Sequence, residues 1–144
     1  DRFGNMNGRV IGEWDNPTVR LGGGGGSGSL LPLANEVFGW RTEHTSRSFP
    51  ERVDFVTASG NLTYVVTPLC VFERHEDDLE VTQLHPGVTR DAVQSNTGWD
   101  VTFNDPTETD LPTDREIEVL QKVDPTKVRE AGFGADQLRE IPRK

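Results

Sequence analysis

A run of five glycines, Gly22 to Gly26, is the part of the sequence best suited to direct contact with a ligand. Glycine has no Cβ atom, so a glycine loop lets the backbone approach a bound group closely. Its backbone N–H groups can converge on a carboxylate, a phosphate or a thioester oxyanion. From the residues alone three interpretations stay open: a flexible structural loop, a thioester or carboxylate site, and a nucleotide-binding fold.

The spacing of these glycines does not favour nucleotide binding. Gly23, Gly25 and Gly28 satisfy the pattern G-x-G-x-x-G, but any glycine run does so. The sequence shows no βαβ pattern with an acidic residue at the required distance, and it lacks the Gly-Lys-Ser/Thr ending of a phosphate-binding loop. The nucleotide-binding fold is therefore the weakest of the three interpretations.

The remaining reactive side chains favour structural roles. His44, His75 and His85 have no metal-ligand partner at a suitable spacing, so we predict no metal site. Cys70, the single cysteine, lies in an apolar run and is expected to be buried.

A charged cluster lies in the middle of the chain. Glu51 and Asp54 flank Arg52, and a carboxylate beside an arginine tends to stay ionised and form an ion pair. We interpret this cluster as a structural or interface network, with a place in the active site as the alternative. Asn61-Leu62-Thr63 matches a glycosylation sequon, which we attribute to chance.

Composition and charge exclude several classes of protein. The 144 residues carry a formal net charge of −9 and no cluster of Lys and Arg, so we predict neither nucleic-acid binding nor binding to a membrane surface. No apolar run approaches the roughly 20 residues of a membrane span, and we expect a cytoplasmic location. Only 33% of the residues are hydrophobic. This low share, and a chain that opens at Asp1 within a turn, predict a fragment whose core is completed by another segment or chain.

The pattern of apolar and turn residues predicts strands alternating with short helices. Expected strands cover residues 9–13, 18–21, 40–49, 52–57, 63–73 (interrupted at Pro68), 79–84 and 99–103. The strands on either side of residues 75–78 should form a hairpin. Expected helices cover residues 30–37, 90–96 and 114–123, with N-caps at Ser29, Thr89 and Thr113 and with Glu116 completing a capping box. This alternation predicts an α/β or α+β domain.

Four stretches together resemble the B subunits of glutaconate CoA-transferase-like proteins. They are the turn Asp1–Asn7, the glycine loop Gly24–Gly28, the segment Glu51–Thr57 (ERVDFVT), and Leu84–Thr89 (LHPGVT) continuing to Thr97–Asp100 (TGWD). The resemblance covers about residues 1–125 and leaves residues 126–144 as a charged C-terminal tail. It identifies the first part as the C-terminal portion of a B-subunit-like domain.

The resemblance implies an α/β fold with an open, mostly parallel sheet and flanking helices. Such a fold would be incomplete without the N-terminal half of its own subunit and a homologous A subunit as partner. The resemblance also implies a glutamate that forms a glutamyl-CoA thioester. In the family that glutamate lies upstream of the turn at residues 1–7, so no residue of this chain is expected to be the catalytic nucleophile.

The expected reaction moves coenzyme A between an acyl-CoA and a small carboxylic acid, with coenzyme A as a substrate and no cofactor. Two alternatives are a hydrolase or lyase of the same fold acting on a CoA thioester, and a supporting subunit without catalysis. Under the first interpretation the glycine loop would donate N–H groups to the thioester, and two asparagines would shape the edge of the site. The predicted substrate-binding residues are Gly24, Gly25, Gly26, Ser27, Gly28, Asn5 and Asn7.

Overall fold

The structure is a computed structural model that describes residues 1–133. Residues 1–108 form one compact unit, and the chain from residue 109 onward belongs to a second. Residues 134–144, which make up most of the predicted charged tail, lie outside the described part of the chain.

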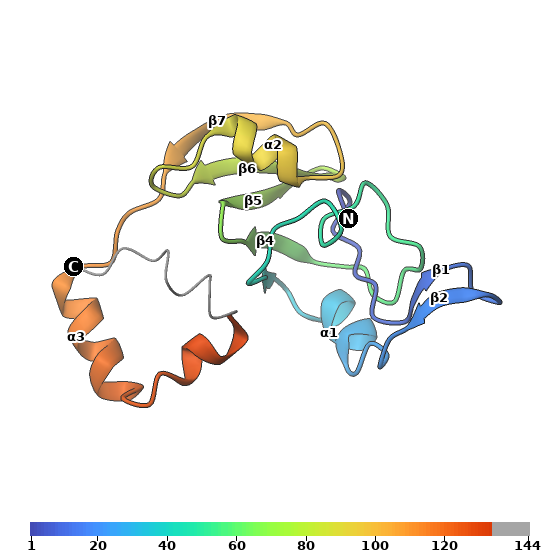
Figure 1. The fold of residues 1–144 in the computed structure, drawn as a ribbon, viewed down its shortest axis with the longest axis horizontal. Coiled ribbons are helices and arrows are strands. Elements are labelled where there is room, and N and C mark those ends of the chain that lie inside the picture. Colours follow the sequence, from blue (N-terminus) through green and yellow to red (C-terminus); the bar gives the residue numbers. More distant parts are fainter. Residues whose placement is uncertain (134–144) are drawn as a thin grey trace. The chain divides into compact units, whose positions relative to one another are not determined.

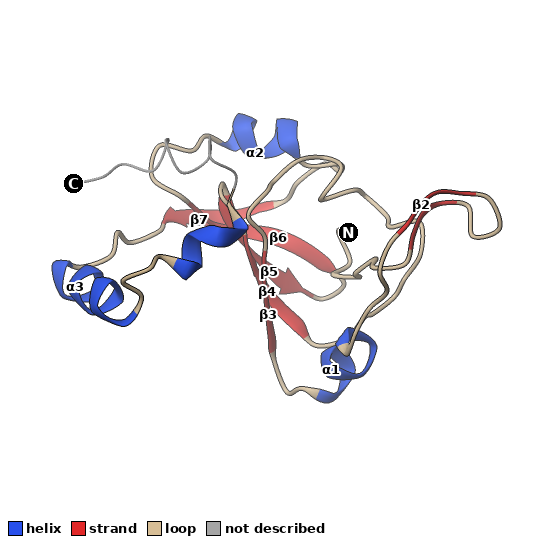
Figure 2. Ribbon diagram, turned by 60° about the horizontal axis from the view of Figure 1, so that its bottom comes forward, coloured by secondary structure: helices blue, strands red, loops and turns tan. Residues whose placement is uncertain are grey.

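The first unit is built on a five-stranded mixed sheet, visible in Figures 1 and 2. Its strands lie side by side in chain order. They are β3 (Val37–Trp40), β4 (Leu62–Val66), β5 (Cys70–His75), β6 (Asp78–Leu84) and β7 (Phe103–Glu108). The pairs β3–β4 and β6–β7 are parallel, whereas β4–β5 and β5–β6 are antiparallel. The α/β class is confirmed, but the sheet is mixed and not mostly parallel.

Short hairpins explain the antiparallel pairs. Pro68 cannot donate a backbone hydrogen bond, so the long apolar run predicted at 63–73 is interrupted there. Thr67 holds the resulting turn, because its hydroxyl accepts the N–H groups of Leu69 and Cys70 at 3.2 and 3.1 Å. The predicted hairpin between β5 and β6 is confirmed, and His75 pairs with Asp78 at its tip.

Two further elements precede the sheet. β1 (Val10–Gly12) and β2 (Pro17–Arg20) form a separate antiparallel hairpin. The helix α1 (Ser27–Leu33) then begins directly after the glycines, with Gly26 as its N-cap. It starts two residues before the predicted cap at Ser29, so Ser27 and Gly28 belong to its first turn.

A βαβ crossover connects the parallel strands β6 and β7 through α2 (Arg90–Asn96), which lies over one face of the sheet in Figure 2. The predicted N-cap is confirmed, since the hydroxyl of Thr89 accepts the N–H of Ala92 at 3.1 Å. Val93 points into the core and is fully buried.

Three predicted strands are wrong in part or entirely. β3 ends at Trp40, where the expected strand at 40–49 should have begun, and residues 52–57 are irregular. Backbone groups in both segments bond to other partners: the N–H of Phe49 donates to Thr45 within a turn, and the N–H of Thr57 donates to Met6. The last strand starts at Phe103, beyond most of the predicted segment 99–103.

The core lies between the sheet and α2. Its largest fully buried side chains include Phe72, Leu79 and Val81, and the Trp99 ring lies near Phe72 at a centroid distance of 5.8 Å. Cys70 is buried as predicted, and burial raises the pKa of its thiol to about 12. An un-ionised thiol is a poor nucleophile, so Cys70 acts as a small apolar residue.

His44 is a polar group inside this core. It is 6% exposed, and its Nδ1 and Nε2 atoms lie 2.8 and 3.0 Å from the hydroxyls of Thr67 and Thr97. Burial lowers the pKa of His44 to about 4, because the charged imidazolium would lose its hydration.

This pKa shift predicts a loss of stability at mildly acidic pH. Above pH 6.5 the imidazole of His44 is neutral in both the folded and the unfolded state. As the pH falls from about 6.5 towards 4, the unfolded chain takes up a proton that the folded chain excludes. The free energy of unfolding should therefore fall by about 2–3 kcal/mol over this window. Urea unfolding of the complete protein between pH 7 and 4.5, with and without His44→Gln, measures the contribution.

A second histidine gives the matched control. His75 lies at the hairpin tip with a half-exposed side chain, so His75→Gln makes the same substitution outside the buried core. The prediction fails if His44→Gln loses as much stability between pH 7 and 4.5 as the wild type does.

The second unit contains α3 (Asp114–Val123) and a 3-10 helix at Val128–Gly132. The predicted capping box is present: the Thr113 hydroxyl accepts the N–H of Glu116, and the Glu116 carboxylate accepts the N–H of Thr113. None of the helices in residues 1–133 is long and apolar enough to cross a membrane.

Candidate functional site

The glycine loop connects β2 to α1 and is held at both ends. The N–H of Gly23 donates to the carbonyl of Gly8 at 2.8 Å. At the other end, the N–H and the hydroxyl of Ser27 both donate to the carbonyl of Gly24, at 2.9 and 2.6 Å. The loop is thus anchored to the segment before β1 and shaped by the first residue of the helix.

Thr57 is the side chain against which the loop packs. A Cβ atom at Gly24 would lie 2.4 Å from Cγ2 of Thr57, and a Cβ atom at Gly28 would lie 3.4 Å from its carbonyl oxygen. The Thr57 hydroxyl also accepts the N–H of Gly8 at 2.9 Å. Only glycine fits at position 24 without a shift of Thr57. Thr57 ends the ERVDFVT motif, but its role depends on contacts that the sequence does not reveal.

Several backbone N–H groups of the loop have no acceptor within residues 1–133. They belong to Gly22, Gly24, Gly25, Gly26 and Gly28. The N–H of Ser27 is different, because it already donates to Gly24. The loop can therefore offer Gly26 and Gly28 as donors to an oxyanion, while Ser27 closes the turn between them.

The two predicted asparagines fold the N-terminal segment. Asn7 Oδ1 accepts the N–H groups of Arg9 and Val10 at 3.0 and 3.2 Å. The N–H and the side-chain amide of Asn5 donate to the carboxylate of Asp1 at 3.0 and 3.3 Å. Both asparagines also line a groove of about 620 Å³, which places them at the rim of a space that a ligand could occupy.

We call this space the arginine groove, because Arg41, Arg47 and Arg52 line it. It runs between the N-terminal segment and the chain that follows β3. Leu21, the residue that precedes the glycines, lines it as well, but residues 22–28 do not. The glycine loop therefore adjoins the groove and does not form its wall.

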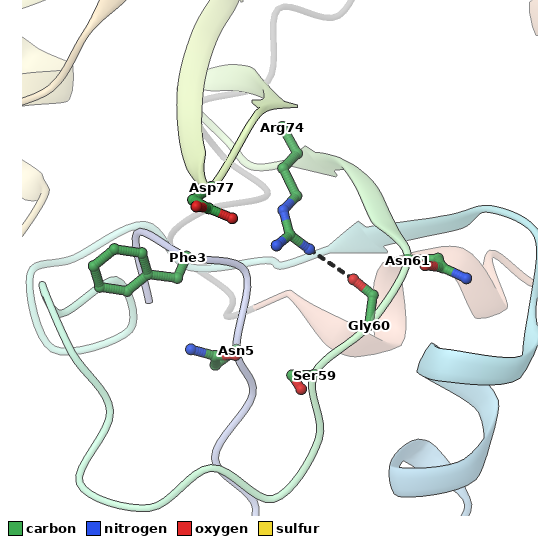
Figure 3. A pocket seen from close by; sticks show the side chains of 7 residues that line it. All are labelled: Phe3, Asn5, Ser59, Gly60, Asn61, Arg74 and Asp77. Carbon is green, nitrogen blue, oxygen red and sulfur yellow. Dashed lines mark hydrogen bonds between the residues drawn. The ribbon is translucent and has the colours of Figure 1, made fainter.

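A second cavity, of about 570 Å³, lies on the other side of Asn5 and is drawn in Figure 3. The Arg74 side chain reaches from β5 to Gly60, and its Nη1 donates to the Gly60 carbonyl at 2.7 Å. The other residues that line this cavity are Phe3, Ser59, Asn61 and Asp77.

Asn61, beside this cavity, fixes the end of α1. Its N–H donates to Leu31 at 3.0 Å and its side-chain amide to Ala34 at 2.7 Å. These bonds satisfy carbonyls that the end of a helix leaves without partners. Arg74 and Asn61 together position α1, and with it the glycine loop.

The charged cluster at residues 51–54 does not form one network. Glu51 lies 3.8 Å from Arg2, Arg52 lies over the ring of Phe3 at 4.6 Å, and Asp54 accepts the N–H of Gly12 at 2.8 Å. The structural interpretation is supported, but each residue has its own partner. In residues 1–133 no three His, Cys, Asp or Glu side chains come together in a way that could hold a metal ion.

Comparison with known proteins defines the class. Residues 1–96 match the family model for coenzyme A transferases, and the chain belongs to the coenzyme A transferase family. The predicted resemblance is thereby confirmed.

Two curated relatives and one solved structure are similar over most of this chain. The B subunit of 3-oxoadipate CoA-transferase from Pseudomonas knackmussii is 36% identical, over 86% of this chain and 55% of that protein. The IpdB subunit of the cholesterol ring-cleaving hydrolase from Rhodococcus jostii is 33% identical, over 90% and 58%. The structure of glutaconate coenzyme A-transferase from Acidaminococcus fermentans superposes with a TM-score of 0.79 at 21% identity, covering 93% of this chain and 57% of that one. The chain thus spans a little over half the length of these relatives.

Proposed function

We propose that this chain is part of the B subunit of an acyl-CoA:carboxylate CoA-transferase, which works with an A subunit. The observation that carries the proposal is the family match over residues 1–96, which includes a glycine loop with open backbone N–H groups. The relative from Pseudomonas knackmussii, which is 36% identical, is named as such a subunit. In the complete protein, this chain would bind and polarise the thioester.

The proposed reaction needs a carboxylate nucleophile supplied by another part of the protein. A glutamate attacks the thioester carbonyl, the C–S bond breaks, and the CoA thiolate leaves. The thiolate then attacks the glutamyl carbonyl, which releases the first acid and leaves a glutamyl-CoA thioester. A second acid reverses both steps. The negative charge that develops on the thioester oxygen is what the N–H groups of Gly26 and Gly28 would stabilise.

Hydrolysis is the second candidate, because a relative 33% identical is named as a ring-cleaving hydrolase subunit. A hydrolase or lyase would use the same loop to polarise a CoA thioester, but it would transfer no CoA to a second acid. A non-catalytic supporting role would leave the loop without a ligand.

Trapping of the intermediate distinguishes these candidates. The complete protein, with its partner subunit, is incubated with a panel of short-chain and dicarboxylic acyl-CoAs and then treated with borohydride or hydroxylamine. A transferase should yield a modified glutamate, identified by peptide mass spectrometry. Samples without acyl-CoA, or with free CoA alone, serve as controls. Turnover of an acyl-CoA without any modified glutamate would favour hydrolysis and count against transfer.

A further inference from the structure

The arginine groove concentrates positive side chains in a chain that carries a formal net charge of −9. Arg41 and Arg47 form no ion pair and no side-chain hydrogen bond with any part of residues 1–133. Within the same residues, the Arg52 guanidinium contacts only the ring of Phe3, at 4.6 Å. Each guanidinium carries about five N–H donors in a planar fork, so the groove has unused donors that match phosphate oxygens.

The acidic residues on the same lining are turned to other partners. The Asp1 carboxylate accepts the N–H groups of Phe3, Asn5 and Val53 at 3.0 to 3.2 Å. Elsewhere on the lining, Asp54 and Glu43 accept hydrogen bonds from Gly12 and Thr45. None of these three carboxylates forms an ion pair with Arg41, Arg47 or Arg52, so the guanidinium groups stay available to a ligand.

The backbone positions two of the arginines firmly. The N–H of Arg41 donates to the carbonyl of Val66 at 2.9 Å and so continues the pairing of β3 with β4. Arg47 lies inside a turn closed by the N–H of Phe49, which donates to Thr45 at 2.8 Å. A ligand therefore needs to order the side chains of these residues but not their backbone, which lowers the entropic cost of binding.

Beneath the charged rim the groove has an apolar floor. Phe49, Leu62, Val65 and Leu79 line it and are each no more than 6% exposed. Its volume of about 620 Å³ lies within the usual range for small-molecule sites. A groove with a charged rim and an apolar base fits a ligand that has a polyanionic end and a less polar body.

We propose that the arginine groove binds the phosphate-bearing end of the acyl-CoA substrate, with Arg41 and Arg47 as the phosphate ligands. The inference rests on the proposed function, because the groove adjoins the glycine loop at Leu21. The phosphates of CoA match the several arginines of the groove better than the carboxylate of the acid substrate does. One small carboxylate neutralises a single guanidinium, whereas a nucleotide diphosphate offers oxygens to several.

Binding of CoA and of pantetheine, which lacks the phosphates, tests this assignment. Calorimetry on the complete two-subunit protein should show that Arg41→Gln and Arg47→Gln each weaken CoA binding about tenfold. The dissociation constant of pantetheine should stay unchanged. Arg90→Gln is the matched control, because Arg90 packs over Phe103 at 5.2 Å and does not line the groove.

The assignment would be overturned if the wild type bound CoA and pantetheine with equal affinity. It would also be overturned if the two variants bound both ligands more weakly to the same degree, or if they raised KM for the acid while their affinity for CoA stayed unchanged. A protein that binds CoA through these arginines but never forms a glutamyl adduct would contradict transfer and leave the groove assignment intact. Adduct formation with unchanged CoA affinity in both variants would contradict the groove assignment alone.

Discussion

Replacing Gly26 by valine is expected to lower kcat/KM of the complete enzyme by about 10²–10³-fold, because the side chain would keep an oxyanion away from the N–H groups of the loop, at a cost comparable to the loss of one donor. The branched side chain would stand beside the open N–H groups of Gly26 and Gly28. The fold should survive, because among the described residues a Cβ atom at Gly26 would meet only the Leu30 side chain, at 3.2 Å. Leu30 is 65% exposed and can turn away. Steady-state kinetics with acyl-CoA, together with a thermal unfolding curve, measure both effects.

Gly22 offers a control within the same loop. It is not among the proposed donors, and a Cβ atom there would meet nothing within 4 Å in residues 1–133. Gly22→Val should therefore keep kcat/KM within a few-fold of the wild type. Near-normal activity of Gly26→Val, or an equal loss in both variants, would contradict the role assigned to the Gly26 and Gly28 amides.

Gly60→Ala is expected to destabilise the protein by about 3 kcal/mol. Gly60 has a φ of +154°, and an added Cβ atom would lie 2.5 Å from the carbonyl carbon of Leu31 and 2.6 Å from the nitrogen of Pro32. These are backbone atoms of α1 and cannot rotate away, so the helix has to move. The hydrogen bonds from Asn61 to the end of α1 would weaken as well. Urea unfolding of the complete protein measures the change in the free energy of unfolding.

A substitution at Gly87 distinguishes the cost of backbone strain from the cost of steric overlap between the added Cβ atom and its neighbours. Its φ of +79° is also positive, but a Cβ atom there would meet nothing within 4 Å in the described part of the chain. Gly87→Ala should therefore cost only the strain of a left-handed residue, about 1 kcal/mol. If the two variants were equally stable, the close approach of Gly60 to α1 would have no energetic consequence.

Local hydrogen bonds account for the elements that could be predicted well. The N-caps at Thr89 and Thr113 are confirmed, and both use a side chain that bonds a backbone group three residues ahead. Such bonds depend on neighbours in the sequence alone. The helix at the glycine loop was less well predicted, because its N-cap, Gly26, provides no side-chain bond.

Long-range bonds account for the wrong strands. The segment predicted at 52–57 alternates like a strand, but its backbone bonds to the N-terminal residues: Val53 to the carboxylate of Asp1, and Thr57 to Met6. The mixed sheet has a similar cause. The tight turn at Thr67–Cys70 reverses the chain, so β5 runs antiparallel to β4. A parallel pair would need a longer crossover.

Composition and motifs of neighbouring residues were enough to predict the family, the α/β class and the glycine loop. The amides of the loop that stay open, and the side chains that hold the loop, became known only from the folded chain. Thr57 and Asn61 support the loop and α1 from more than 20 residues away. The arginine groove likewise joins segments that lie far apart in the sequence. Contacts of this kind follow from the packing of the whole unit, and no local pattern of residues encodes them.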